Sequence, residues 1–255
     1  MSSTAEEYGL IGFPLTHSFS QRYFNEKFNS EKIDAVYHNF QLSDIGELME
    51  MLAEHPRLQG FNVTLPYKEQ VIPYLDEIDT KAKEIGAVNV VKVTHLNNGD
   101  IRLKGFNSDY IGFLDSLVPL LKGNTDSHAA LILGTGGASK AVRVALQSIG
   151  AKVSMVSRTM KPEVDYTYGD LTEKVIADHD IIVNTTPLGM YPDSEKCPPI
   201  PYQYISSGHI LYDLIYNPDI TTFMKRGAER GATVKNGLEM LLLQAFESWR
   251  IWTSK

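Results

Sequence analysis

Short apolar segments alternate with amphipathic segments along almost the whole chain, and this order constrains the possible folds more than any other feature. Residues 8–13, 35–42 and 129–134 are typical of buried strands. Residues 43–55 (SDIGELMEMLAEH) carry apolar side chains at helical spacing and acidic ones in the first turn, which predicts a helix. Strands separated by helices predict βαβ units with a mostly parallel sheet, and therefore an α/β fold.

Length and composition exclude several classes of protein. The chain has 255 residues, enough for two domains of ordinary size. Its formal net charge of −7 argues against a nucleic acid partner, because phosphate binding needs a basic face. No apolar run is long enough to span a membrane, and the only cysteine, Cys197, cannot form an internal disulfide. No Cys/His cluster has zinc spacing, so we expect no metal site, and a reduced cytoplasmic location fits.

Residues 132–141 (ILGTGGASKA) have the pattern of a nucleotide-binding loop between a buried strand and a helix. Gly134 permits a tight turn, and Gly136 and Gly137 let backbone N–H groups approach a pyrophosphate at the positive end of the helix. The third position of the usual G-x-G-x-x-G/A pattern is Ser139, so the match is imperfect. A plain strand–helix turn is the alternative, but the context favours a nucleotide site.

The next predicted strand ends in Ser157–Arg158–Thr159, which indicates the nucleotide that would bind. A site for NAD usually has Asp or Glu here, which holds the ribose 2′-hydroxyl. No carboxylate follows until Glu163, and a guanidinium offers paired donors that suit a 2′-phosphate. The alternative is that Arg158 is an ordinary surface charge. We therefore expect NADP rather than NAD.

In the N-terminal half, polar residues stand alone at the ends of apolar segments. Residues 60–69 (GFNVTLPYKE) alternate like a half-buried strand, with Phe61, Val63 and Leu65 on one face. The polar face would then point at a ligand. The candidates of this kind are Ser18, Ser20, Asn62, Thr64, Lys68, Asn89, Asp109 and Gln244.

Each candidate also has a structural explanation. Ser18 or Ser20 could be an N-cap, and Asp109 could cap the helix that follows it. Asn89 could bond within a turn, and Lys68 could be a solvated charge. Gln244 is harder to explain in this way, because it interrupts the most apolar helix and a buried amide needs partners. A histidine at a strand–helix junction is more often structural than catalytic, so His17 is left outside the set.

Together the candidates fit a dehydrogenase that acts on a polyol. Such an enzyme must bind several hydroxyl groups, anchor any acid group, and supply or remove a proton as hydride moves to or from the nicotinamide. A lysine beside an aspartate can transfer that proton, because the carboxylate orients the ammonium group.

In order and spacing, the motifs resemble those of the shikimate dehydrogenase family over nearly the whole chain. The matching segments are HSFS, FNVTLPYK, GAVNV, GFNSD, GTGGAS, SRT, NTTPLGM, DLIYNP and NGLEMLLLQA. Members of this family reduce 3-dehydroshikimate to shikimate with NADPH, in aromatic amino acid biosynthesis. The resemblance implies that Lys68 is the general acid/base and that Asp109 is its partner.

The resemblance also implies the other site residues. The substrate carboxylate would be bound by Ser18, Ser20 and Tyr216. The ring hydroxyls would be bound by Thr64, Asn89, Asp109 and Gln244. The pyrophosphate would lie on Gly134, Gly136, Gly137 and Ala138. The adenosine phosphate would contact Ser157, Arg158 and Thr159, and the nicotinamide would lie near Leu214 and Gly237.

The family architecture implies an N-terminal substrate-binding catalytic domain with a mostly parallel sheet and a Rossmann-like NADP-binding domain. The first would comprise residues 1–107, completed by the C-terminal helix 238–255, and the second residues 108–237, with the active site in the cleft between them. The chain departs from the family pattern at Gln21, at Ser157 and Pro162, and in residues 160–171, which are too few for the usual helix. A monomer and a homodimer both remain open.

Two other functions remain open. The first is a related dehydrogenase that accepts quinate or NAD, since quinate differs from shikimate by one added ring hydroxyl. The second is a non-catalytic dinucleotide-binding regulator. A regulator would keep the glycine loop but lose the Lys68–Asp109 pair, and both residues are present.

Overall fold

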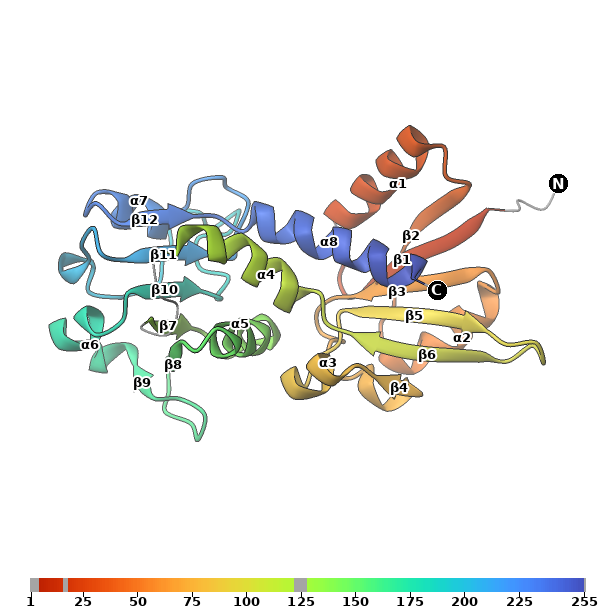
Figure 1. Ribbon diagram of the computed structural model, residues 1–255, viewed down its shortest axis with the longest axis horizontal. Helices are drawn as coiled ribbons and strands as arrows, with labels where there is room; N and C mark the ends of the chain where they lie inside the picture. Colours follow the sequence, from red (N-terminus) through yellow and green to blue (C-terminus); the bar gives the residue numbers. More distant parts are fainter. Residues whose placement is uncertain (1–4, 16–17, 122–127, 255) are drawn as a thin grey trace. The chain divides into compact units, whose positions relative to one another are not determined.

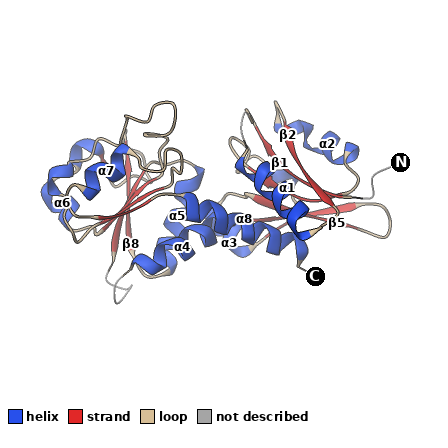
Figure 2. Cartoon of the chain, turned by 90° about the horizontal axis from the view of Figure 1, so that it is seen from above, coloured by secondary structure: helices blue, strands red, loops and turns tan. Residues whose placement is uncertain are grey.

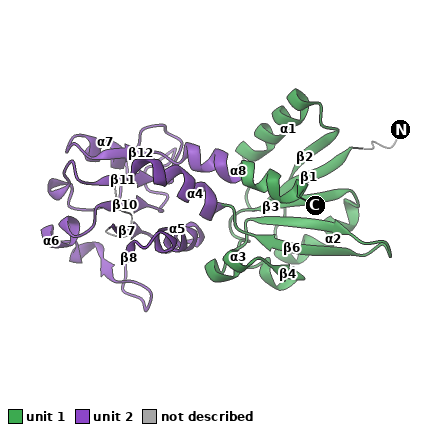
Figure 3. Ribbon diagram, in the orientation of Figure 1, with its two compact units in different colours: residues 1–108, 245–255 green, residues 109–244 purple. Residues whose placement is uncertain are grey.

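The computed structural model describes residues 5–15, 18–121 and 128–254 (Figure 1). His17 lies outside the described residues. The chain divides into two compact units, residues 1–108 with 245–255 (unit 1) and residues 109–244 (unit 2), which Figure 3 distinguishes by colour. Both units are α/β, as the alternation of apolar and amphipathic segments predicted. The second boundary lies within the last helix, at 244/245, whereas the expected division was at 237/238.

Unit 1 is built on a six-stranded mixed sheet with the order β2-β1-β3-β5-β6-β4. Its strands are β1 (Glu6–Gly12), β2 (Ala35–Gln41), β3 (Leu58–Val63), β4 (Glu77–Ile78), β5 (Val90–His95) and β6 (Ile101–Phe106). β1 runs parallel to β2 and β3, while β5 is antiparallel to β3 and β6. The carboxyl ends of β1 and β3 therefore lie side by side, which brings the segments after them together.

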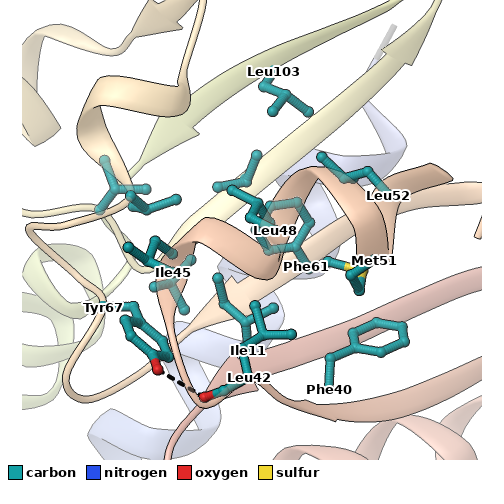
Figure 4. Close-up of a cluster of buried hydrophobic side chains, with 14 of the residues drawn as sticks. Ile11, Phe40, Leu42, Ile45, Leu48, Met51, Leu52, Phe61, Tyr67 and Leu103 are labelled. Carbon is teal, nitrogen blue, oxygen red and sulfur yellow. Dashed lines mark hydrogen bonds between the residues drawn. The ribbon is translucent and has the colours of Figure 1, made fainter. Parts of the chain in front are cut away.

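Helices cover both faces of the unit 1 sheet. They are α1 (Phe19–Glu31), α2 (Leu48–Glu54) and α3 (Thr80–Ile85), with 3-10 turns η1 (Ile45–Glu47) and η2 (Ile72–Tyr74). On one face, Phe24 and Phe28 of α1 pack with Trp252 near the chain end. On the other, Leu48 and Leu52 of α2 pack in a separate cluster (Figure 4). The helix predicted for 43–55 thus consists of η1 followed by α2.

The strand in residues 60–69 is shorter than the alternation indicated. β3 ends at Val63, and the chain then enters a turn. Leu65 is 68% exposed, so the expectation that it shares an inward face with Phe61 and Val63 is wrong. Thr64 and Lys68 consequently lie in a turn beyond the sheet rather than on a strand face.

Unit 2 contains an all-parallel sheet with the order β12-β11-β10-β7-β8-β9. Its strands are β7 (Ala129–Leu133), β8 (Lys152–Ser157), β9 (Tyr166–Thr167), β10 (Ile181–Asn184), β11 (Ile210–Asp213) and β12 (Thr233–Lys235). This is the order of a doubly wound dinucleotide-binding fold, in which successive strands are added in one direction along the sheet up to the third strand and in the opposite direction from the fourth strand on. Here that switch point lies between β7 and β10, so the loop after β7 is in the position where such folds bind a nucleotide.

Helices lie on both sides of the unit 2 strands (Figure 2). They are α4 (Asp109–Leu117), α5 (Gly137–Ser148), α6 (Glu173–Ala177), α7 (Thr222–Ala228) and the beginning of α8 (Leu238–Thr253), with 3-10 turns η3 (Val118–Leu120), η5 (Tyr168–Asp170) and η6 (Tyr202–Tyr204). Met240 of α8 packs with Phe113 of α4 and Val142 of α5. The other face is covered by Ile176 of α6 and Phe223 of α7.

Between β8 and β9 the chain forms no α-helix, and residues 158–165 lead directly into β9. The sequence indicated this, because residues 160–171 were too few for the usual helix. Across the described ranges, no helix is long and apolar enough to cross a membrane.

Candidate active site

In unit 1 a buried hydrogen-bond network lies beside the ends of β3 and β6. Asn62 Oδ1 accepts a bond from the Tyr37 hydroxyl (2.8 Å), and its Nδ2 donates to Ser248 Oγ (2.9 Å) and to the Asn89 carbonyl (3.2 Å). Asn62 is therefore used inside the protein, and the expectation that it points at a ligand is wrong. Its partners are neutral, so this network carries no charge.

The backbone around Lys68 is fixed from two sides. The hydroxyl of the buried Tyr67 donates to the Leu42 carbonyl (2.7 Å; Figure 4), and the Lys68 carbonyl accepts a bond from Val88 N–H (2.7 Å). Thr64 N–H donates to the Ile11 carbonyl (3.0 Å), which ties the start of the same turn to β1. The side chains of Thr64 and Lys68 are both half-buried. The turn thus presents a hydroxyl and an ammonium group from a rigid backbone.

Asn89 fixes the start of α4. Its Oδ1 accepts a bond from Ser108 N–H (2.7 Å), and its Nδ2 donates to Ser108 Oγ (3.1 Å). Asp109, the next residue, begins α4 and is 8% exposed. The expectation that Asn89 bonds within its own turn is therefore wrong. Its side chain bonds to Ser108, 19 residues further on, and so holds the residue that precedes Asp109.

The other candidate substrate residues differ in burial. Ser18 caps α1, because its Oγ accepts a bond from Gln21 N–H (3.1 Å), and Ser20 lies half-buried in the first turn of that helix. Tyr216 is 41% exposed in the loop after β11. Gln244 is half-buried and donates to the Leu241 carbonyl of its own helix (3.0 Å), so the expectation that it is a buried amide is wrong.

The loop between β7 and α5 has the geometry of a phosphate cradle. Gly134 has φ +111°, and a Cβ there would meet Thr185 Oγ1 at 2.8 Å, so only glycine fits. Gly136 is the N-cap residue of α5, and a Cβ there would point into open space. Gly137 and Ala138 form the first helical turn. Ser139 is buried and donates to the Gly136 carbonyl (2.6 Å), which accounts for its place in the imperfect motif.

The adenosine and nicotinamide candidates also lie at the carboxyl edge of this sheet. Ser157 is the last residue of β8, and Arg158 and Thr159 follow it on the surface. Leu214 follows β11, and a Cβ on Gly237 would lie only 2.1 Å from the Leu214 carbonyl oxygen. The contact between Leu214 and Gly237 therefore requires glycine. Among the described residues, no group of three or more His, Cys, Asp or Glu side chains could hold a metal ion.

Comparison with known proteins connects this geometry to a family. Residues 10–91 match the model of the shikimate dehydrogenase substrate binding domain. The NADP(+)-dependent shikimate dehydrogenase of Methanococcus aeolicus is 36% identical, over 99% of this chain and 94% of that protein. The chain belongs to the shikimate dehydrogenase family.

Solved structures agree with the shikimate dehydrogenase fold in both units. The Aquifex aeolicus shikimate dehydrogenase superposes with a TM-score of 0.85 at 36% identity, covering 99% of this chain and 94% of that one. The Thermus thermophilus enzyme, solved in complex with NADP(H) and shikimate, has a TM-score of 0.82 at 29% identity, covering 97% of this chain and 93% of that one. The predicted fold, a substrate domain followed by a Rossmann-like domain, is confirmed.

A second buried hydrogen-bond network, which was not predicted from the sequence, lies at the carboxyl edge of the unit 2 sheet. The Asp213 carboxylate ends β11 and is fully buried. It accepts bonds from Asn184 Nδ2 (3.0 Å), Thr221 Oγ1 (2.6 Å) and Ile215 N–H (3.1 Å). Burial raises the pKa of Asp213 to about 6, although these hydrogen bonds act to lower it. The feature of the sequence that could have indicated this network is an acidic residue, Asp213, at the end of an apolar strand.

Proposed function

We propose that the protein is an NADP-dependent shikimate dehydrogenase, which reversibly reduces 3-dehydroshikimate to shikimate with NADPH. The observation that carries the proposal is its 36% identity with the named enzyme over nearly the whole length of both chains. The chain also keeps Lys68, Asp109 and Arg158 at the family's motif positions. The pathway in which it works would be aromatic amino acid biosynthesis.

We assign the proton transfer to Lys68. Reduction of a ketone requires a hydride at carbon and a proton at oxygen, and bound NADPH supplies the hydride. Lys68 would donate its proton to the carbonyl oxygen, and in the reverse direction it would accept the proton of the hydroxyl. Asp109 would orient the ammonium group through a charge-assisted hydrogen bond. The rigid turn around Lys68 and the fixed start of α4 support these roles.

We assign substrate binding to polar side chains near the same positions. The carboxylate would be bound by Ser18, Ser20 and Tyr216. The ring hydroxyls would be bound by Thr64, Asn89, Asp109 and Gln244. Asn89 has two N–H donors on its amide, and Ser108 takes one of them. Hydroxyl, amide and carboxylate groups together suit a ligand that has several hydroxyls and one acid group.

We assign the cofactor to unit 2. The pyrophosphate would lie on Gly134, Gly136, Gly137 and Ala138, where the open space at Gly136 leaves room for it. The adenosine phosphate would contact Ser157, Arg158 and Thr159. The nicotinamide would lie near Leu214 and Gly237. Arg158 is exposed and can therefore meet a phosphate without first losing a buried partner.

We further propose that residues 1–107 with the C-terminal helix form the catalytic domain, that residues 108–237 form the NADP domain, and that the enzyme works in the cytoplasm as a monomer or homodimer. The acidic composition and the single cysteine support this location. Shikimate and 3-dehydroshikimate would be its small-molecule substrates.

The test is an absorbance assay of nicotinamide reduction with shikimate or quinate, each combined with NADP or NAD. We expect fast reduction only with shikimate and NADP. Turnover with quinate or NAD would assign the protein to a broader quinate/shikimate dehydrogenase. NADP binding without turnover in any combination would instead favour the non-catalytic regulator.

A further inference from the structure

Tyr168 and Arg158 lie next to each other at the carboxyl edge of the unit 2 sheet. β8 and β9 run parallel, and their last paired residues are Ser157 and Thr167. Arg158 and Tyr168 each follow the paired residue of their own strand. Because neighbouring strands lie about 5 Å apart, the two residues start from adjacent backbone positions at the carboxyl edge.

The position of the Tyr168 ring is fixed by its surroundings. The ring is half-buried and packs against the core cluster that contains Val156 and Leu171. The 3-10 turn that carries it is closed by Asp170, whose Oδ2 accepts bonds from Thr167 N–H (2.8 Å) and Thr167 Oγ1 (2.6 Å). The phenol therefore loses little freedom when a ligand binds to its hydroxyl.

The Tyr168 hydroxyl is a hydrogen-bond donor near a guanidinium. Burial raises the pKa of Tyr168, and the charge of Arg158 acts to lower it, so Arg158 lies within electrostatic reach of the phenol. With a raised pKa, the hydroxyl keeps its proton at neutral pH. A protonated phenol can donate to a phosphate oxygen while the neighbouring guanidinium binds the same phosphate.

The local structure explains why the chain would use a tyrosine here. The chain departs from the family pattern at Pro162, and between β8 and β9 it forms no α-helix. Instead, the short connection brings β9 and Tyr168 back to the end of β8. Asp165, which precedes β9, accepts a bond from Met155 N–H (2.7 Å) and is thus engaged further back along β8.

We propose that Tyr168 is a specificity-determining residue for the cofactor, whose hydroxyl donates a hydrogen bond to the 2′-phosphate of NADP that Arg158 binds. This inference rests on the proposed function, because it adds a residue to the proposed phosphate site. It predicts that recognition of the 2′-phosphate in this chain depends on a neutral donor as well as on Arg158.

The test compares the wild-type protein with Tyr168→Phe and Tyr166→Phe, without substrate. Fluorescence titration gives the Kd of NADPH and of NADH, and calorimetry gives the Kd of adenosine 2′-monophosphate and of adenosine 5′-monophosphate. Tyr166 is half-buried on the neighbouring strand β9, so its variant is a matched control for loss of a phenol hydroxyl. Melting temperatures of all three proteins check that they fold alike.

We expect Tyr168→Phe to weaken NADPH and adenosine 2′-monophosphate about tenfold, because a hydrogen bond to a charged group is lost. NADH and adenosine 5′-monophosphate should change by less than about twofold, and Tyr166→Phe should leave all four values within that range. In an Arg158→Ala background the effect of Tyr168→Phe should shrink to about threefold or less, because both residues bind one phosphate.

An unchanged NADPH:NADH ratio in Tyr168→Phe, with a wild type that prefers NADPH, would overturn this inference and leave the proposed function intact. Equal weakening of NADPH and NADH would also overturn it, because the hydroxyl would then serve the fold or the adenosine. A wild type without any preference for NADPH would overturn the proposed cofactor, and this inference with it.

Discussion

Each unit has a buried hydrogen-bond network beside the carboxyl ends of its strands, at β3 in unit 1 and at β11 in unit 2, but the two networks differ in charge. In unit 1, Asn62 is bonded to Tyr37, Ser248 and the Asn89 backbone, all of which are neutral. In unit 2, the buried group is the Asp213 carboxylate, which is held by neutral donors. Burying a charge without a charged partner is unfavourable, so the buried Asp213 carboxylate lowers the stability of unit 2 while it fixes the positions of its hydrogen-bond donors.

The difference teaches where charge is used in each unit. The neutral network of unit 1 holds the strand ends without adding a charge of its own near the half-buried Lys68. In unit 2, Asp213 lies directly before Leu214, and Asn184, its partner, lies directly before Thr185, which contacts Gly134. One carboxylate thus links the end of β11, from which the proposed nicotinamide site extends, to the end of β10, whose next residue contacts the glycine loop.

The largest expected effect comes from removing the proposed proton donor of unit 1. Lys68→Ala should lower kcat about a thousandfold, because general acid/base catalysis contributes about two to four orders of magnitude. The Kd of NADPH, measured by fluorescence titration, should change less than about twofold. Lys83→Ala, an exposed lysine of α3, is the control and should leave both values unchanged. A parallel loss of turnover and NADPH binding would contradict the division of roles between the units.

The second effect concerns the pH dependence of stability. The pKa of Asp213 is about 6 in the folded protein, whereas the ordinary value of this group, which applies to the unfolded chain, is 3.8. Between these values the folded state binds more protons than the unfolded state, so the free energy of unfolding falls as pH rises from about 4 to about 6. The loss should be about 3 kcal/mol, since one pKa unit corresponds to about 1.4 kcal/mol.

Urea unfolding at pH 4, 5, 6 and 7 measures this slope. Asp213→Asn has no group to titrate at this position, so its curve should lack the fall that the wild type shows. Asn62→Ala is the matched control from the neutral network. Its free energy of unfolding should be lower than that of the wild type by about 2 kcal/mol at every pH. Identical pH curves for Asp213→Asn and the wild type would show that Asp213 does not titrate in this range.

The third effect is on cofactor choice. Arg158→Ala should weaken NADPH binding about thirtyfold, because the proposed guanidinium–phosphate pair would be lost. NADH lacks the 2′-phosphate, so its Kd should change less than about twofold. Both values come from the same fluorescence titration. Lys161→Ala, an exposed basic residue nearby, tests whether any positive charge suffices, and an effect as large as that of Arg158→Ala would argue for diffuse attraction.

Local patterns made much of this fold predictable. The α/β order follows from alternating strands and helices, and the loop at Gly134 and Gly136 follows from a motif whose residues are adjacent in sequence. β5 and β6 pair antiparallel around Asn98–Gly99, a dipeptide that is typical of tight hairpin turns. Each of these depends on residues close together in the chain, which is why the sequence alone was enough.

The failures came from contacts between distant residues. Asn62 looked like part of a ligand-facing strand surface, but its partners Tyr37 and Ser248 are far away in the sequence. Asp213 was missed for the same reason, since Asn184 and Thr221 become its partners only after the strands pair. Leu65 was misplaced because the alternation continues for two residues after β3 has ended.

The smallest effect separates two glycines of unit 2. At Gly136, with φ −78° and ψ 178°, alanine fits the backbone and its methyl group enters open space. Gly136→Ala should therefore change the free energy of unfolding by less than about 1 kcal/mol, yet weaken NADPH binding because the methyl group would occupy the proposed pyrophosphate position. At Gly237 the methyl group would lie 2.1 Å from the Leu214 carbonyl oxygen, so the backbone must move.

Gly237→Ala should accordingly lose about 1–2 kcal/mol of stability as well as NADPH affinity. Urea unfolding and NADPH titration of the two variants give both quantities. We expect Gly136→Ala to lose NADPH affinity but not stability, and Gly237→Ala to lose both. This result would show that Gly136 leaves open space for the ligand, whereas Gly237 belongs to a packed contact that holds the backbone of the site in place. If Gly136→Ala kept full NADPH affinity, the pyrophosphate could not lie on that residue, because its methyl group would occupy the same space.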